Sequence, residues 1–133
     1  MVKWISHRGE SHDAPENTLA AFRLARERRT DGIECDVHLT CDGQVIVAHD
    51  ADTNRMGDRC IELEKSDWAT VRGIDVSGGF ADCCPGERIP LLREVLTELR
   101  PEEECYVELK GSNPALVGAV AKTLHEVAAD LRR

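Results

Sequence analysis

A strand, a tight turn and a second strand follow one another between Gly32 and Asp50, and this stretch restricts the possible folds more than any other. Only Thr40–Gly43 separates the two apolar runs, and so short a connection cannot form the crossover that joins parallel strands. The two strands are therefore expected to pair antiparallel, at least locally. Folding back at this turn brings His49 level with the first strand.

The first of these strands carries two carboxylates on one face. Glu34 and Asp36 are two residues apart, so their side chains point to the same side of the strand, whereas the opposite face is apolar: Ile33, Cys35 and Val37. Neighbouring like charges repel, so a positive group is expected between them. A hard divalent cation held by oxygen ligands is the simplest candidate.

The residues before this stretch predict a parallel α/β sheet. Val2–Ser6 is a short apolar strand, and Asn17 or Thr18 can cap a helix that runs to about Arg29. The strand at Asp31–Val37 follows at once. Strand, helix and strand in succession form the unit of a parallel sheet.

The residues after this stretch predict an excursion and then a third sheet strand. Between Ala51 and about Arg88 the hydrophobic pattern weakens and glycines interrupt it, which indicates an excursion from the sheet and not a separate domain. Cys105–Lys110 alternates apolar and polar side chains, as a strand with one charged face does. Three further helices are expected: a short one at 66–71 capped by Ser66, one from Pro90, and one after Asn113-Pro114 whose buried stripe includes Val117, Val120, Leu124, Val127 and Leu131.

Composition excludes several classes of function. The net charge of -8 argues against a general nucleic-acid or anionic-membrane surface, and 4% aromatic residues are too few for base-stacking platforms. No apolar run has the length that spans a bilayer, and no signal peptide is recognised. Six cysteines without a Cys-x-x-Cys spacing favour reduced thiols in a cytoplasmic protein.

Polar side chains gather where the expected parallel strands end, which is where sites form in such folds. The three carboxylates of this group, Glu34, Asp36 and Glu108, suit Ca²⁺ or Mg²⁺ and do not distinguish between them. His7 and His49 are suited to general acid and base chemistry near neutral pH.

Two cations complete this group. Arg8 follows the first strand and Lys110 ends the third, and both can hold phosphate oxygens. Plainer interpretations exist for several of these residues. His7 could cap a loop, Glu108 and Lys110 could pair with each other, and Asp50 could be a turn residue or support a ligand from behind. His38 is expected at the surface.

The motifs of the chain, in their order and spacing, resemble the glycerophosphodiester phosphodiesterase family. They are His7-Arg8-Gly9, Pro15-Glu16-Asn17-Thr18, Glu34-x-Asp36-Val37, Thr40-x-Asp42-Gly43, His49-Asp50, Ile89-Pro90-x-Leu92 and Glu108-x-Lys110. The resemblance covers nearly the whole chain. It implies an α/β fold of the TIM-barrel type found in phospholipase C-like phosphodiesterases. Residues 1–133 would form its N-terminal part, with a small insertion after the second strand, here called the insertion segment (residues 40–88).

The resemblance also implies a role for each site residue. Glu34, Asp36 and Glu108 would bind the divalent metal, His7 and His49 would be the acid–base pair, and Arg8 and Lys110 would neutralise the phosphoryl group. The implied reaction, part of lipid and glycerol metabolism, is hydrolysis of a small-molecule glycerophosphodiester to glycerol 3-phosphate and an alcohol.

Length leaves alternatives open. A TIM barrel takes about 250 residues and eight strands, whereas this chain supplies three barrel strands and the insertion segment. The open sheet edge predicts a homo-oligomer or a complementing barrel half. One alternative function is a related barrel phospholipase that acts on lipid phosphodiesters. Another is a non-catalytic truncated remnant that self-associates.

Overall fold

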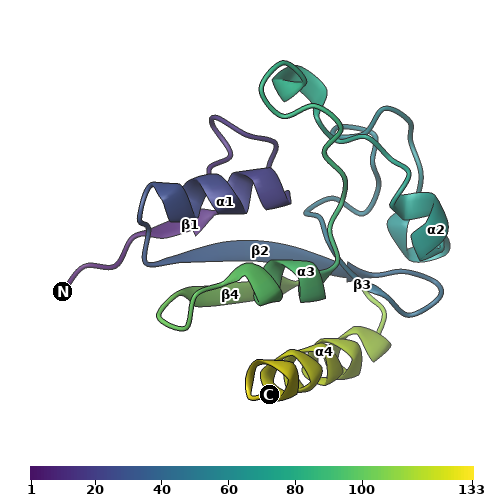
Figure 1. The fold of residues 1–133 in the computed structure, drawn as a ribbon. Helices are drawn as coiled ribbons and strands as arrows, with labels where there is room; N and C mark the ends of the chain where they lie inside the picture. The colour runs from purple at the N-terminus through teal and green to yellow at the C-terminus, as the bar shows by residue number, and fades with distance from the viewer.

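The computed structural model describes residues 1–133, and at its centre lies a four-stranded sheet in which β2 (Gly32–Leu39) pairs with every other strand (Figure 1). β1 (Ile5–His7) and β4 (Glu104–Leu109) both pair with β2 in parallel, whereas β3 (Val45–Val47) pairs with its last residues antiparallel. The antiparallel hairpin that the short turn predicts is therefore confirmed.

The first strand begins later than the sequence indicates. Ile5 pairs with Gly32, the first residue of β2, so Val2–Trp4 have no neighbouring strand and lie exposed. Gly32 also sets how closely β2 approaches β4, which pairs with the other edge of β2. A Cβ atom at this position would lie 2.3 Å from the backbone oxygen of Glu104, so only glycine allows β2 and β4 to come this close.

Three helices cover the apolar face of the sheet: α1 (Leu19–Glu27), α3 (Leu92–Glu98) and α4 (Ala115–Leu131). They contribute Phe22, Leu92 and Val120, among others, to one core cluster that also contains Ile33, Cys35 and Val37 of β2. Burying each large side chain of this kind stabilises the fold by about 1.5–3 kcal/mol. The apolar face predicted for β2 is thus buried in the main core, beneath the three helices.

Two helix starts differ from the sequence predictions. Pro90 does not begin α3, because Leu91 forms a bridge with Ile46 that keeps this backbone extended. The short helix α2 (Trp68–Val71) is capped by the Asp67 carboxylate, which accepts a hydrogen bond from the Thr70 N–H, and not by Ser66. Thr18, by contrast, caps α1 as expected, since its hydroxyl accepts from the Ala21 N–H.

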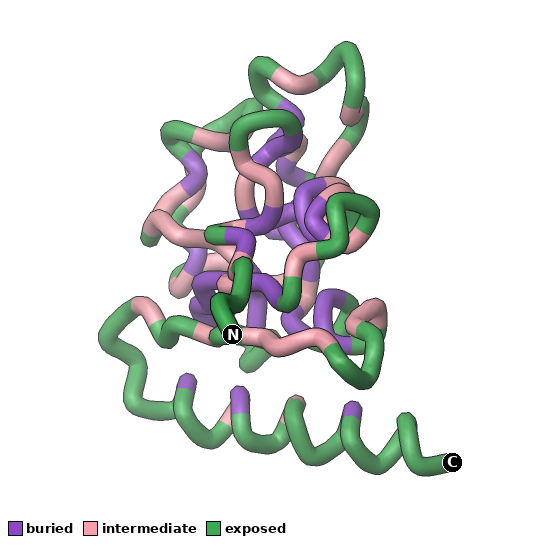
Figure 2. Tube along the Cα trace, turned by 90° about the vertical axis from the view of Figure 1, so that its left-hand side faces the viewer, coloured by how far each residue is buried: buried purple, intermediate pink, exposed green.

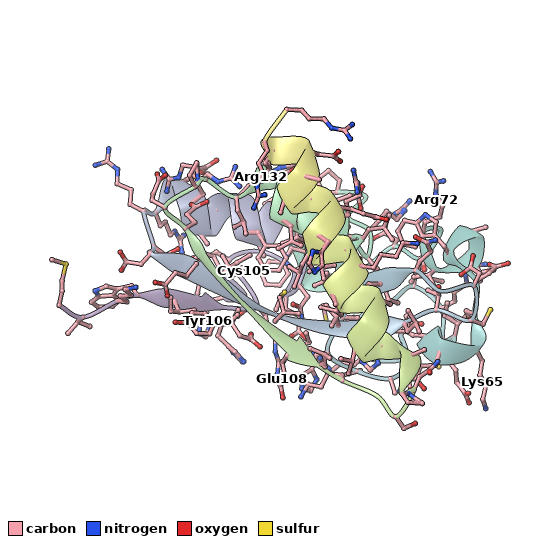
Figure 3. The ribbon with its side chains drawn as sticks, turned by 90° about the horizontal axis from the view of Figure 1, so that it is seen from below. Lys65, Arg72, Cys105, Tyr106, Glu108 and Arg132 are labelled. Atoms are coloured by element: carbon pink, nitrogen blue, oxygen red, sulfur yellow. The ribbon has the colours of Figure 1, made fainter.

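The last helix buries a narrower stripe than its sequence predicts. Leu116, Val120 and Val127 reach the core, whereas Val117 and Leu131 are exposed, and Figure 2 shows the long stretches of exposed backbone between the buried positions. The reason is that α4 packs only against the sheet and α3, so its outer side has no neighbour. Figure 3, which views the molecule from below, shows α4 crossing the sheet, where it contacts β2 and β3.

The insertion segment has a small core of its own. Leu63, Val71, Ile74 and Val76 pack together against Ile46 of β3, near the start of the same segment. Two single-turn 3-10 helices, η1 (Leu63–Lys65) and η2 (Gly78–Phe80), lie within this segment. The part of the segment after β3 is therefore anchored on the hairpin that leads to His49.

Two strand edges of the sheet are unpaired. β1 and β4 each pair with β2 alone, so the outer edge of each has no partner strand. Trp4 and Tyr106 are exposed at or beside these edges. None of the helices combines the length and the apolar character needed to cross a membrane.

Candidate functional site

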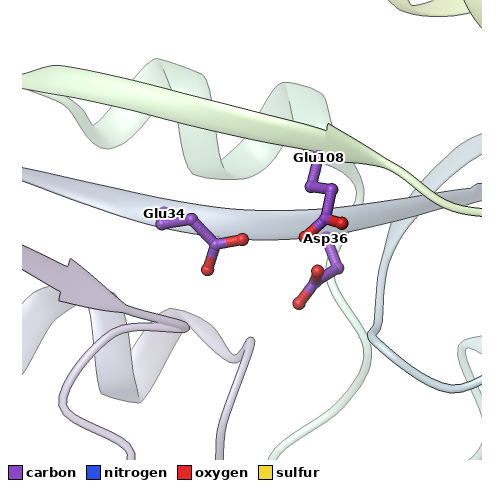
Figure 4. A group of neighbouring side chains, drawn as sticks. All are labelled: Glu34, Asp36 and Glu108. Atoms are coloured by element: carbon purple, nitrogen blue, oxygen red, sulfur yellow. The ribbon is translucent and has the colours of Figure 1, made fainter.

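Three carboxylates meet on the polar face of the sheet (Figure 4). Asp36 of β2 lies directly opposite Glu108 of β4 in the parallel register, and Glu34 precedes Asp36 by two residues on the same face. Their ligand atoms all lie within 4.8 Å of one another. Oxygen ligands on opposite sides of a Ca²⁺ ion are about 5 Å apart, so the spacing suits such an ion.

Asp36 lies at the bottom of this group and is fully buried. Its Oδ2 atom accepts a hydrogen bond of 3.0 Å from the Asn17 amide and lies 3.3 Å from Nε of Arg8. Its Oδ1 atom has no hydrogen-bond partner, and the nearest cation, Nζ of Lys110, is 3.9 Å away. A buried carboxylate oxygen without a partner is costly, so this atom is suited to a metal ion.

The neighbouring charges affect the other two carboxyls in opposite ways. Burial, and then the charge of Asp36, raises the pKa of Glu34. The hydrogen bond from Lys110, 3.0 Å between Nζ and Oε1, lowers the pKa of Glu108. The group therefore holds crowded negative charge on its buried side and a partly neutralised carboxylate at its exposed side.

Arg8 enters the site on a strained backbone. Its φ of 58° lies in the left-handed region, which a residue with a side chain adopts at a cost of about 1 kcal/mol. The backbone is held there because the Arg8 N–H donates to the Glu34 carbonyl at 2.9 Å and its carbonyl accepts from the Asn17 N–H at 2.9 Å. This geometry directs the guanidinium toward Asp36.

Asn17 was not among the site residues expected from the sequence, yet it is buried beside Asp36. It has a φ of 57°, and asparagine tolerates this conformation better than most residues do. Besides donating to Oδ2, its amide oxygen accepts from the Asp36 N–H at 3.4 Å. Its place in the Pro15-Glu16-Asn17-Thr18 motif was the available signal.

The two histidines lie on different elements. His7, at the end of β1, is exposed, and its Nε2 atom is 3.7 Å from Oε2 of Glu34. His49 follows β3, and the preceding residue, Ala48, donates its N–H to the Asp36 carbonyl at 2.9 Å. The hairpin thus returns His49 to the carboxylates, as the turn predicts.

His49 is held at two points. Its Nδ1 atom lies 2.7 Å from Oδ1 of Asp50, and its backbone carbonyl lies 3.0 Å from Nε2 of His38. The expectation that His38 lies at the surface is wrong: it is 2% exposed, because η1 packs over this end of β2. His38 is therefore a buried support for the His49 backbone.

Glu16 and Arg55 are two charged residues that the sequence did not single out for the site. The Arg55 guanidinium bridges Glu16 and Asp50, and this hydrogen bonding, followed by that of His49, lowers the pKa of Asp50 to about 2. Glu16 also approaches Arg8, with 3.3 Å between Oε1 and Nη1. No spacing pattern could have identified Arg55, because it lies in the weakly patterned insertion segment.

Comparison with known proteins places these features in a family. The model of the glycerophosphoryl diester phosphodiesterase family matches residues 7–130. Glycerophosphodiester phosphodiesterase 1 of Mus musculus is 39% identical over 113 residues, which are 83% of this chain and 34% of that protein. The putative glycerophosphodiester phosphodiesterase YhdW of Bacillus subtilis is 39% identical over 114 residues, which are 86% of this chain and 46% of that protein.

Solved structures show the same relation. A glycerophosphodiester phosphodiesterase of Agrobacterium tumefaciens superposes with a TM-score of 0.85 at 34% identity, covering 96% of this chain and 54% of that one. A phosphodiesterase of Oleispira antarctica, in complex with the product sn-glycerol-3-phosphate, superposes with a TM-score of 0.87 at 29% identity, covering 94% and 52%. The chain thus spans about half the length, or less, of the relatives it matches, and its fold is part of a TIM-barrel-type domain, as predicted.

Proposed function

Because this chain belongs to the glycerophosphoryl diester phosphodiesterase family, we propose that it hydrolyses glycerophosphodiesters to glycerol 3-phosphate and an alcohol. The relatives it resembles are named as phosphodiesterases of this kind, and one solved relative holds the product sn-glycerol-3-phosphate. The observation that carries the proposal is the meeting of Glu34, Asp36 and Glu108, with their ligand atoms within 4.8 Å, beside two histidines and two cations.

Glu34, Asp36 and Glu108 would hold a divalent cation, either Ca²⁺ or Mg²⁺. The unpartnered Oδ1 atom of Asp36 and the oxygen-only donor set both fit such a hard ion. When bound, the ion supplies Lewis-acid stabilisation of negative charge on a phosphate oxygen.

His49 and His7 would move the protons. An ionised carboxylate can only accept a hydrogen bond, so Nδ1 of His49 would carry the proton that it donates to Asp50. Nε2 would then hold the lone pair that can accept a proton from the substrate. One histidine takes a proton from the attacking hydroxyl as its oxygen bonds to phosphorus. The other gives a proton to the alcohol oxygen as its bond to phosphorus breaks.

Arg8 and Lys110 would bind the phosphate. Both already face Asp36, at 3.3 Å and 3.9 Å, so they lie on the same side of the sheet as the acidic group. A guanidinium can hold two phosphate oxygens at once, and an ammonium supplies a compact positive charge. Together they lower the electrostatic cost of bringing an anion to a chain with a net charge of -8.

Hydrolysis of glycerophosphocholine, with and without EDTA, tests the proposed function. We expect turnover to need the divalent cation and to fall at least about 100-fold in His49→Ala, the usual loss on removing a general acid or base. His125→Ala, an exposed histidine on α4, is the matched control and should retain full activity. Turnover that survives EDTA, or full activity in His49→Ala, would reject the mechanism. Faster cleavage of phospholipid vesicles would favour the barrel phospholipase alternative.

We also propose that residues 1–133 act as one incomplete barrel domain with its insertion segment, in the cytoplasm. The six cysteines are all free thiols in the structure, which agrees with a reducing compartment. The unpaired edges of β1 and β4 would be covered by a second copy or by a complementing barrel half. Light scattering tests this point, since a stable monomer at high concentration would contradict self-association.

A further inference from the structure

Arg55 makes an unusual set of contacts for a residue in a loop. Its Nη1 and Nη2 atoms lie 3.0 Å and 2.7 Å from the two oxygens of Glu16. Its Nε and Nη2 atoms lie 3.0 Å and 3.2 Å from the two oxygens of Asp50. One planar guanidinium therefore binds two carboxylates, each through both of its oxygens, and only arginine has the donors for this.

Each of these carboxylates leads directly to a group of the site. Oδ1 of Asp50 is 2.7 Å from Nδ1 of His49. Oε1 of Glu16 is 3.3 Å from Nη1 of Arg8, whose Nε is 3.3 Å from Asp36. Arg55 thus connects the loop that follows β3 to one proposed acid–base residue and to one proposed phosphate-binding residue, without reaching the carboxylates that would bind the metal.

Removing the Arg55 side chain would unbalance this arrangement. Glu16 and Asp50 are close enough for the charge of one to act on the other, and without the guanidinium they repel. A cavity of about 30 Å³ lies beside them and is lined in part by Glu16, His49 and Asp50. Together with the space that the removed guanidinium leaves, this cavity lets the repelled carboxylates turn apart, so the Asp50–His49 contact would loosen.

We propose that Arg55 is a positioning residue: through Asp50 it fixes the orientation and the Nδ1–H tautomer of His49, and through Glu16 it steadies Arg8. The catalytic consequence of this inference rests on the proposed function, whereas the tautomer of His49 does not. The insertion segment would then complete the site from outside the barrel strands.

The first test is the nitrogen-15 NMR spectrum of the His49 imidazole in the wild type and in Arg55→Ala. We expect the wild type to show a protonated Nδ1 and an unprotonated Nε2, and Arg55→Ala to show a mixture of the two tautomers. Arg88→Ala is the matched control, because Arg88 forms a similarly exposed ion pair with Asp75, at 3.1 Å, and touches no site residue. An unchanged His49 spectrum in Arg55→Ala would overturn the proposal.

The second test is kinetic, with glycerophosphocholine and the required cation. We expect kcat to fall by about 100-fold in Arg55→Ala, since misplacing a reacting group costs about that much. KM should change much less, because Arg8 keeps its own contact with Asp36, at 3.3 Å. Added guanidinium chloride should restore part of kcat, whereas potassium chloride at equal ionic strength should not. Arg55→Lys should recover little, because an ammonium cannot bind both carboxylates through four contacts.

These two tests separate the inference from the proposed function. A wild type without phosphodiesterase activity would reject the function, and the NMR comparison would still decide whether Arg55 orients His49. An Arg55→Ala variant with wild-type kcat would reject the positioning role while leaving the function intact.

Discussion

Adding a divalent cation should stabilise this protein by relieving the repulsion among its acidic side chains. Glu34 and Asp36 present ligand oxygens within 4.8 Å of each other, and at this separation two carboxylates repel by about 3.5 kcal/mol in an effective dielectric of about 20. Arg8 and Lys110 offset part of this cost but leave Oδ1 of Asp36 without a hydrogen bond. A bound cation would supply the missing partner.

The size of the effect follows from mass action. At a free cation concentration about 100 times Kd, binding adds about 2.7 kcal/mol to the free energy of unfolding. For 133 residues the unfolding entropy is about 0.28 kcal/mol per kelvin, so the melting temperature should rise by about 10 °C. Differential scanning fluorimetry with CaCl₂ or MgCl₂, against KCl at equal ionic strength, measures this shift.

A variant of Glu108 tests whether the acidic group is the cause. Glu108 is exposed at the end of the group, so Glu108→Gln removes one charged ligand without leaving a hole in the core. With about tenfold weaker binding, the shift at the same cation concentration should fall to about 5 °C. Glu102→Gln, an exposed carboxylate outside the site, should keep the full shift. Equal shifts with divalent and monovalent salt, or an unchanged shift in Glu108→Gln, would refute this account.

Two further predictions concern stability. The pKa of Asp50 is lowered from 3.8 to about 2, so above pH 4 its ion pairs stabilise the folded state by about 1 kcal/mol, after allowance for solvent screening. This stabilisation is lost as the pH falls toward 2. In urea titrations, Asp50→Asn should abolish that part of the acid dependence of the unfolding free energy. Gly32→Ala should destabilise the fold by about 1–3 kcal/mol, because the new Cβ atom would meet the Glu104 backbone. Gly118→Ala should stabilise the fold by about 0.5–1 kcal/mol, because Gly118 lies in open space on α4. Equal urea midpoints for the two variants would contradict this.

The parts of the fold set by local pattern could be predicted from the sequence. The Thr40–Gly43 turn leaves no room for a crossover, so the antiparallel hairpin follows from chain length alone. That Glu34 and Asp36 lie on the same face of β2 follows from the two-residue period of a strand. Their meeting with Glu108 could be anticipated because parallel strands end at the same edge of a sheet.

Other parts depend on contacts that no local pattern encodes. The burial of His38 depends on η1 packing over the end of β2, and the exposure of Val117 depends on which neighbours α4 lacks. Asn17 could be placed beside Asp36 only once the backbone of Arg8 was known. Arg55 reaches the site across a segment with little periodicity, so charge pairing in space was its only signal.

The central place of β2 has a consequence for how the molecule opens. Because β2 pairs with all three other strands, its amides should exchange with solvent more slowly than those of β4, which has a single partner strand. Glu34 and Asp36 therefore lie on the strand that opens last, whereas Glu108 lies on one that can detach first. Partial opening would remove one of the three carboxylates while the core remains closed, so release of a bound ion need not await global unfolding.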